Sequence, residues 1–195
     1  GMLYENGHAV ENGRALLPDY ATAATWFRKA WAQGNAEAAR HLGFMYDHGG
    51  NGLTQNYALA VDWYRKAANG GDAVAQNNLG LLYAQGQRIA EAEQCYRRSV
   101  EIVQDNAAAY GHLGVLLAAQ ERTAEAERCY RRGLALNPGN AALHCNLGVA
   151  LAAQQRRDEA EWHYRRVVAL DPRQIKGHTN LGNLLARAGR YAEAE

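Results

Sequence analysis

The sequence predicts an all-α fold, a right-handed superhelical solenoid built from antiparallel helix pairs. Two kinds of repetition predict it. A Leu-Gly pair recurs every 34 residues, beginning at Leu79, Leu113, Leu147 and Leu181. The pattern Glu-Ala-Glu-x-x-Tyr-Arg-Arg keeps the same interval, beginning at Glu91, Glu125 and Glu159. Self-similarity at a fixed period of about 20–50 residues is typical of solenoids, in which each unit packs only on its neighbours.

The first part of the chain repeats on a longer step. Leu42-Gly43 and Leu79-Gly80 lie 37 residues apart, and so do Trp26 and Trp63. We expect second helices that end at the turns Gly34-Asn35 and Gly71-Asp72, and a long loop over residues 47–56. Residues 1–4 should belong to a first helix, and residues 5–19 to an irregular loop.

The later part of the chain follows the 34-residue step. In the unit 107–140, Ala- and Leu-rich residues predict helices over 108–120 and 123–136, and Pro138 closes the second one because proline cannot continue a helix. Gly114 precedes Ala126 by twelve residues, as Gly148 precedes Ala160. These small residues are expected to face each other across the helix pair.

Those residues resemble known repeat families. The 34-residue spacing, the Leu-Gly pair and the later Ala, Tyr and Pro positions resemble tetratricopeptide repeats. The 37-residue step with Trp-Tyr-Arg-Lys-Ala-Ala resembles the Sel1-like variant of that fold. We therefore expect Sel1-like repeats over 1–72 and tetratricopeptide repeats over 73–106, 107–140, 141–174 and 175–195, the last unit being incomplete and the first incomplete or irregular.

Composition excludes several partner classes. The chain has 195 residues, 21 Lys and Arg against 20 Asp and Glu, and 48% hydrophobic residues. It is too apolar to be disordered, its balanced charge disfavours a nucleic-acid partner, and its apolar runs fall short of the roughly 18 residues that cross a membrane. Three cysteines, an odd number, favour free thiols in the cytoplasm, with the periplasm as the alternative.

Catalytic and metal-binding motifs are missing from the sequence, so we expect no enzyme activity and no cofactor. Cys95, Cys129 and His163 occupy the same position in three units. Equivalent positions in stacked helices lie about 8–10 Å apart, too far to share a metal ion. His144 and His178 are expected to be partly buried and structural.

Charged residues of the second helices are expected to neutralise one another. Each pair of adjacent arginines follows a glutamate by four residues, the favourable orientation for ion pairs on an exposed helix face. The expected pairs are Glu93 with Arg97, Glu127 with Arg131, and Glu161 with Arg165.

The binding surface is expected on the first helices, which line the concave face when helix pairs stack. The residues before the Leu-Gly pairs are Asn78, His112, Asn146 and Asn180. An asparagine amide both donates and accepts hydrogen bonds, which suits the backbone of an extended peptide. The predicted surface also contains Asn77, Leu81, Val115, Val149 and Asn183.

The asparagines resemble the ladder in the tetratricopeptide array of O-linked N-acetylglucosamine transferases, with His112 as a departure. The alternative is that each amide bonds a neighbouring repeat. Residues 107–120 and 141–155 carry no charged side chain, which favours a neutral ligand. Chaperone-binding members of the family grip a C-terminal carboxylate with lysines, and the positions for such a clamp hold Asn77, Gly111, Cys145 and Thr179.

The sequence therefore predicts a non-enzymatic scaffold that binds an extended protein segment on its concave face, and not an acidic C-terminal tail. Two alternatives remain open. The array could be the substrate-recruiting arm of a larger enzyme, such as a glycosyltransferase, because the chain ends inside a repeat. It could also self-assemble end to end, because its terminal repeats lack polar capping faces.

Overall fold

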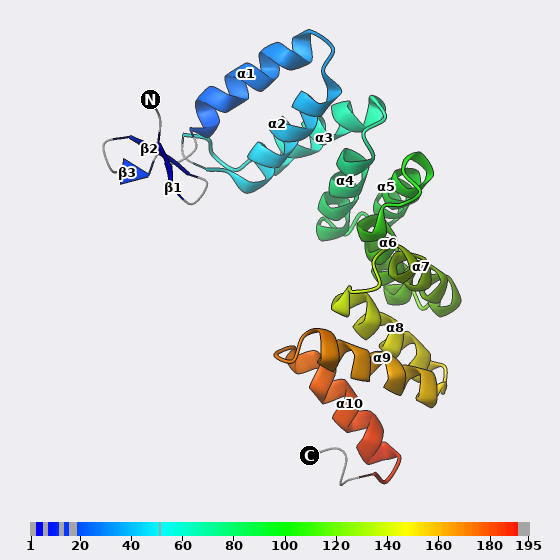
Figure 1. Cartoon of the computed structure of the whole chain (residues 1–195). Helices are drawn as coiled ribbons and strands as arrows, with labels where there is room; N and C mark the ends of the chain where they lie inside the picture. The colour runs from blue at the N-terminus through cyan, green and yellow to red at the C-terminus, as the bar shows by residue number, and fades with distance from the viewer. Residues whose placement is uncertain (1–2, 6–7, 12–13, 16–18, 51, 191–195) are drawn as a thin grey trace. The chain divides into compact units, whose positions relative to one another are not determined.

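The computed structural model describes residues 3–5, 8–11, 14–15, 19–50 and 52–190, with side chains from residue 19 onward. These residues form three short strands and ten helices (Figure 1). The strands are β1 (Leu3–Glu5), β2 (His8–Glu11) and β3 (Arg14–Ala15). The helices are α1 (Tyr20–Ala32), α2 (Ala36–His48), α3 (Tyr57–Asn69), α4 (Ala73–Gln85), α5 (Ile89–Ile102), α6 (Ala107–Ala119), α7 (Thr123–Leu136), α8 (Ala141–Ala153), α9 (Arg157–Leu170) and α10 (Ile175–Arg187).

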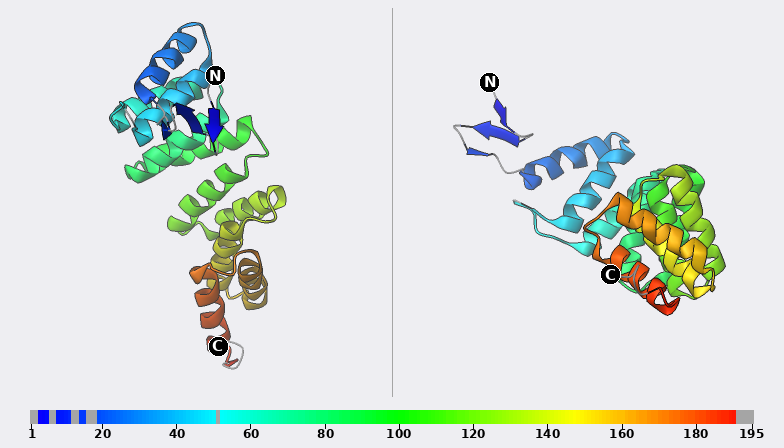
Figure 2. Two further views of the ribbon diagram at one scale, coloured as in Figure 1. Left: turned by 60° about the vertical axis from the view of Figure 1, so that its left-hand side comes forward. Right: turned by 60° about the horizontal axis from the view of Figure 1, so that its bottom comes forward.

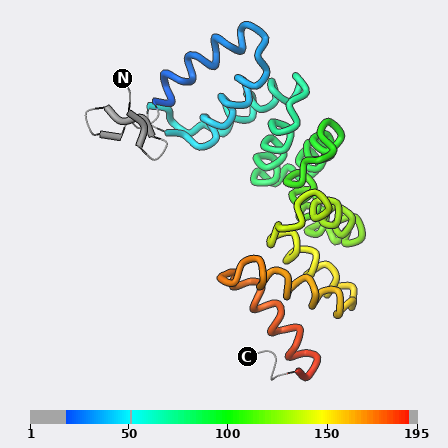
Figure 3. Tube along the Cα trace, viewed as in Figure 1, coloured from blue at the N-terminus to red at the C-terminus, as the bar shows by residue number. Residues whose placement is uncertain are grey.

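The chain divides into two compact units, Gly1–Gly86 and Gln87–Glu195, and each is described by itself. In both, every helix packs on the next one along the chain (Figure 3). The predicted architecture of packed helix pairs is confirmed from Tyr20 to Arg187. The last five residues of the expected incomplete repeat lie outside the described residues.

The extreme N-terminus differs from the prediction. The three strands form an antiparallel sheet in the order β1-β2-β3, with Tyr4 opposite Ala9 and Val10 opposite Ala15. A first helix was expected to include Leu3 and Tyr4, and that expectation is wrong; residues 1–2 lie outside the described part. Asn-Gly separates the strands in the sequence at residues 6–7 and 12–13. This dipeptide strongly favours hairpins, which explains the difference.

Helices α1 to α3 of the first unit follow the Sel1-like expectation. The predicted turns are present, with Gly34 and Gly71 at φ angles of 90° and 86°, a region where glycine carries no steric cost. Asn35 and Asp72 then cap α2 and α4 by accepting hydrogen bonds from backbone N–H groups. The core of this unit is centred on Leu42.

Helices α5 to α10 of the second unit run back and forth as hairpins (Figure 2). The predicted helices over 108–120 and 123–136 are confirmed to within one residue at each end. First helices also contact each other: α6 packs on α8, and α8 on α10. The three therefore form a continuous row, which carries the predicted binding residues of the second unit.

Gly114 and Gly148 of the Leu-Gly pairs allow close packing, and the nearest neighbour of each is a tyrosine ring. Ala126 and Ala160 are buried, but the atoms nearest to where a Cβ would stand belong to tyrosine rings. At Gly148 such an atom would lie 2.5 Å from Cε1 of Tyr164. The glycine therefore faces a tyrosine ring, a contact that was not predicted from the sequence. A glycine is needed because a large ring fills the space opposite it.

Candidate functional site

The predicted surface of the second unit is centred on Asn146. Val115 and Val149, each 50% exposed, lie on neighbouring first helices and line a cavity of about 280 Å³ with Asn146. The ring of Tyr130 forms part of the cavity wall. Among the described residues, no hydrogen bond is made by the Asn146 side chain. A polar amide with unused donors and acceptors thus lies between two exposed apolar side chains.

The other predicted residues of this unit are less uniform. His112 lies against Tyr96, with ring centroids 5.7 Å apart, and burial lowers its pKa, which keeps the imidazole neutral near pH 7. Asn180 donates a hydrogen bond to Sγ of Cys145 at 3.5 Å. Asn183 is exposed on α10. Asn146, which is partly exposed, combines apolar neighbours with an amide that makes no hydrogen bond to the described residues.

In the first unit, Asn78 and Leu81 share a cavity of about 530 Å³ with Phe44 and Asp47. Asn77 is only 7% exposed and does not line it. Adjacent residues on a helix lie about 100° apart around its axis, so the residue before a ladder position turns toward the packed interior. Gly111 and Cys145, at the equivalent positions in α6 and α8, are buried for the same reason.

The ladder asparagines also make contacts of the kind that the alternative interpretation predicts. Burial raises the pKa of Tyr64 above its usual range, and a hydrogen bond with Asn78 offsets part of that rise. Asn180 bonds to Cys145 of the preceding repeat, as described above. Because an amide offers two hydrogens and two lone pairs, neither bond exhausts its side chain.

Charge is separated between first and second helices. No charged residue occurs in α4, α6 or α8. The expected ion pairs on the second helices are confirmed: Arg97 lies 2.9 Å from Glu93, Arg165 lies 2.9 Å from Glu161, and Arg131 pairs with Glu127. Helices α4, α6 and α8 are therefore uncharged, whereas the first helix α10 carries Lys176 and Arg187.

Sequence reasoning missed a second set of ion pairs that joins consecutive repeats. The arginine that follows a first helix reaches back to a glutamate of the preceding second helix. Arg122 donates to Glu93 at 2.7 Å, Arg156 to Glu127 at 2.6 Å, and Arg190 to Glu161 at 2.7 Å. These arginines recur every 34 residues in the sequence, but that spacing does not predict which glutamates they bind.

A histidine cluster was also missed. Nδ1 of His144 lies 2.8 Å from Nδ1 of His163, and Nε2 of His144 lies 3.0 Å from the carbonyl oxygen of Pro138. Trp162 packs against both rings beside a cavity of about 420 Å³. The expectation that His144 is buried is confirmed. His178 makes the same bond to Pro172 but is exposed, so the expectation of partial burial is wrong there.

Within the described residues, no group of three or more His, Cys, Asp or Glu is arranged to hold a metal ion. None of the three cysteines forms a disulfide. No helix in the described part of the chain is long and apolar enough to cross a membrane.

We expect the histidine cluster to make the second unit sensitive to mild acid. Burial, and next the neighbouring His144, lower the pKa of His163 to about 4 from a usual value of 6.5. As pH falls from 6.5 to about 4, the unfolded chain therefore binds a proton that the folded chain does not, and stability decreases. His163→Cys, which copies Cys129 of the preceding repeat, should weaken this dependence in thermal unfolding followed by circular dichroism. An unchanged pH dependence would contradict the assignment.

Family comparisons agree with this geometry. The Sel1 repeat matches residues 1–35 and 36–72, and the tetratricopeptide repeat matches residues 71–139 and 112–175. The two tetratricopeptide matches together span more than half of the chain. No curated protein matches the chain in sequence.

Solved structures share the fold. YrrB, a tetratricopeptide repeat protein with an unusual peptide-binding site, superposes with a TM-score of 0.73 at 21% identity over 88% of each chain. The antigen c5321 of uropathogenic Escherichia coli, which has an SLR fold, gives a TM-score of 0.73 at 25% identity over 87% of this chain and 38% of its own.

A third structure is the first tetratricopeptide domain of Spaghetti (RPAP3) with the HSP90 peptide SRMEEVD, which gives a TM-score of 0.58 at 22% identity over 60% of this chain and 93% of its own. At these identities the structural similarity establishes the shared architecture. With the repeat matches and the helix pairs described above, it shows that the chain belongs to the tetratricopeptide repeat superfamily and carries Sel1-like repeats in its N-terminal part.

Proposed function

We propose that this protein is a non-enzymatic interaction scaffold that binds an extended peptide segment along its first helices. The observation that carries the proposal is the environment of Asn146. Its amide lies between the exposed Val115 and Val149 and makes no hydrogen bond to the described residues. An extended backbone offers one N–H and one C=O per residue, which the amide can bind while apolar side chains pack on the valines.

The repeats themselves support an interaction scaffold. The matches are to Sel1 and tetratricopeptide repeats, and no catalytic family is among them. YrrB has a peptide-binding site, and the Spaghetti domain was solved with a bound peptide. These neighbours favour a peptide or protein partner here, while the partner itself depends on the side chains of this surface.

The bound segment is proposed to be uncharged where it meets α6 and α8. The HSP90 peptide bound by Spaghetti ends in Glu-Glu-Val-Asp. A surface suited to such a tail needs cations, and α4, α6 and α8 contain neither lysine nor arginine. We therefore propose an extended segment of mixed polar and apolar residues. The resemblance of the asparagines to O-linked N-acetylglucosamine transferases remains a prediction from the sequence.

The test is to select ligands from a phage-displayed library of random linear peptides and to measure their affinity by isothermal titration calorimetry. Asn146→Ala should weaken binding about tenfold, the effect of losing one or two buried hydrogen bonds. Asn146 is the best ladder residue for this purpose because it has no structural bond to lose.

Arg128→Ala is the matched control. Arg128 is exposed on the second helix α7, outside the proposed surface, and its loss should leave affinity unchanged. Circular dichroism would establish that both variants keep the helicity of the unmodified protein. If selected peptides bind the Asn146→Ala variant as tightly as the unmodified protein, the proposed surface is wrong.

A further inference from the structure

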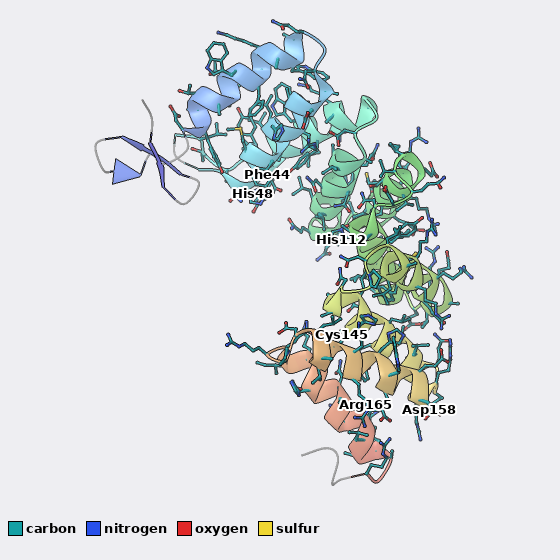
Figure 4. The ribbon with its side chains drawn as sticks, in the orientation of Figure 1. Phe44, His48, His112, Cys145, Asp158 and Arg165 are labelled. Atoms are coloured by element: carbon teal, nitrogen blue, oxygen red, sulfur yellow. The ribbon has the colours of Figure 1, made fainter. Side chains whose placement is uncertain are left out.

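The cavity of about 530 Å³ in the first unit has a chemical character unlike that of the surface around Asn146. It lies between the C-terminal end of α2, the start of α3 and one face of α4. Its polar and aromatic lining consists of the carboxylate of Asp47, the imidazole of His48, three Phe and Tyr rings (Phe44, Tyr57 and Tyr64) and three amides (Gln55, Asn78 and Gln85). Figure 4 shows two of its residues, Phe44 and His48, next to each other on α2.

The carboxylate of Asp47 lacks a strong counter-charge. Its side chain is 21% exposed, and no lysine or arginine in the described part of the chain pairs with it. The nearest cationic candidate is His48, whose Nδ1 lies 3.8 Å away and is 3.0 Å from the carbonyl oxygen of Phe44. Burial raises the pKa of Asp47, as expected of a poorly solvated carboxylate. A cation entering the cavity would supply the missing charge.

The aromatic walls favour a flat cation. Phe44 and Tyr57 are both exposed, which is unusual for large hydrophobic side chains. Phe44 already stacks on the flat imidazole ring of His48, with ring centroids 4.1 Å apart. A guanidinium group stacks on aromatic faces and carries five N–H donors in one plane, whereas an ammonium group is a compact, strongly hydrated charge.

Acceptors for those donors are held in position. The side-chain nitrogen of Gln55 donates to the carbonyl oxygen of Asp47 at 2.6 Å and to the hydroxyl of Tyr57 at 2.9 Å, which fixes the connection between α2 and α3. Because these bonds use the nitrogen, the amide oxygen of Gln55 stays available. With the two oxygens of Asp47, it provides several acceptors around one site.

We propose that this cavity binds the guanidinium group of an arginine side chain, with Asp47 as the counter-ion and the rings of Phe44 and Tyr57 as its walls. This inference rests on the proposed function, because Asn78 and Leu81 line the same cavity and would contact the adjoining peptide backbone. It adds a specificity: a segment bound by the first unit carries an arginine.

N-acetyl-arginine amide, titrated into the full chain and followed by NMR chemical shifts, tests the site directly. N-acetyl-citrulline amide is the matched probe, since it has nearly the same shape without the charge. The arginine probe should bind about tenfold more tightly than the citrulline probe, and Asp47→Asn should abolish that difference. Asp62→Asn, an exposed carboxylate on α3, is the control and should retain it.

Equal binding of the two probes to the unmodified protein would overturn the proposal, and so would an unchanged preference in Asp47→Asn. A lysine probe that binds as tightly as the arginine probe would overturn the assignment to guanidinium. The Asn146→Ala variant separates this inference from the proposed function. It should bind the arginine probe normally, so a failure at Asn146 and a failure at Asp47 give different results.

Discussion

Tyr164→Ala is expected to lower the free energy of unfolding of the second unit by about 3–5 kcal/mol, the usual cost of truncating a buried aromatic side chain. The ring of Tyr164 is buried and fills the space opposite Gly148, where ring atoms lie 2.5 Å from the position of a Cβ. No other side chain can fill that space, because the glycine has none and Ala160 is small. The hairpin formed by α8 and α9 therefore depends on this ring.

Urea denaturation followed by circular dichroism would measure the effect. Trp162→Ala is the matched control, since it truncates an aromatic residue of the same helix that is 59% exposed. The control should change the unfolding free energy by less than about 1 kcal/mol. Equal losses in the two variants would show that the packing of tyrosine on glycine does not hold the hairpin together.

Glu127→Gln is expected to destabilise the second unit by about 1–2 kcal/mol, because it removes a charged acceptor that joins two repeats. Glu127 is 6% exposed and accepts hydrogen bonds from Gln154 at 2.7 Å and Arg156 at 2.6 Å. Arg131 of the same helix pairs with it as well. Glutamine keeps the shape but loses the charge that holds both guanidinium groups.

Acid should have a parallel effect. Burial alone would raise the pKa of Glu127, but the bonds from Gln154 and Arg156 and the charge of Arg131 lower it below its usual value of 4.5. The ionised Glu127 therefore stabilises the second unit above pH 4.5, and this stabilisation decreases as pH falls further. The Glu127→Gln variant should lack this pH dependence. Glu101→Gln, at an exposed ion pair with Arg98, is the control and should have little effect in urea denaturation. A comparable loss in the control would contradict the role of Glu127.

The helices could be predicted because they depend on local signals that recur at a fixed spacing. The residues that start and end α6 and α7 can be read from Ala- and Leu-rich periodicity and from Pro138. The strands at the N-terminus were missed because the repeat pattern was extended to residues that do not follow it. The left-handed backbone of Glu121 and Gln155, with φ angles of 62° and 64°, could not be predicted, because glutamate and glutamine usually avoid that conformation.

The site was predicted less completely because it depends on how neighbouring repeats meet. The ladder positions follow from the spacing, but the burial of Asn77 depends on the rotation of α4 against its neighbours. The contact between His144 and His163 joins residues 19 positions apart on different helices, and no sequence motif predicts it. That Asp47 pairs with His48 and with no lysine or arginine in the described part of the chain could likewise not be predicted, because ion pairing depends on the three-dimensional arrangement.

The proposed function requires that Asn146 binds the backbone of the peptide. The most direct test is a double-mutant cycle in calorimetry, which combines Asn146→Ala with methylation of single backbone nitrogens of a selected peptide. One N-methyl group should weaken binding to the unmodified protein and have no further effect on the variant, because both changes remove the same hydrogen bond. If every N-methylated peptide loses as much affinity for the variant as for the unmodified protein, Asn146 does not bind the backbone and the account is contradicted.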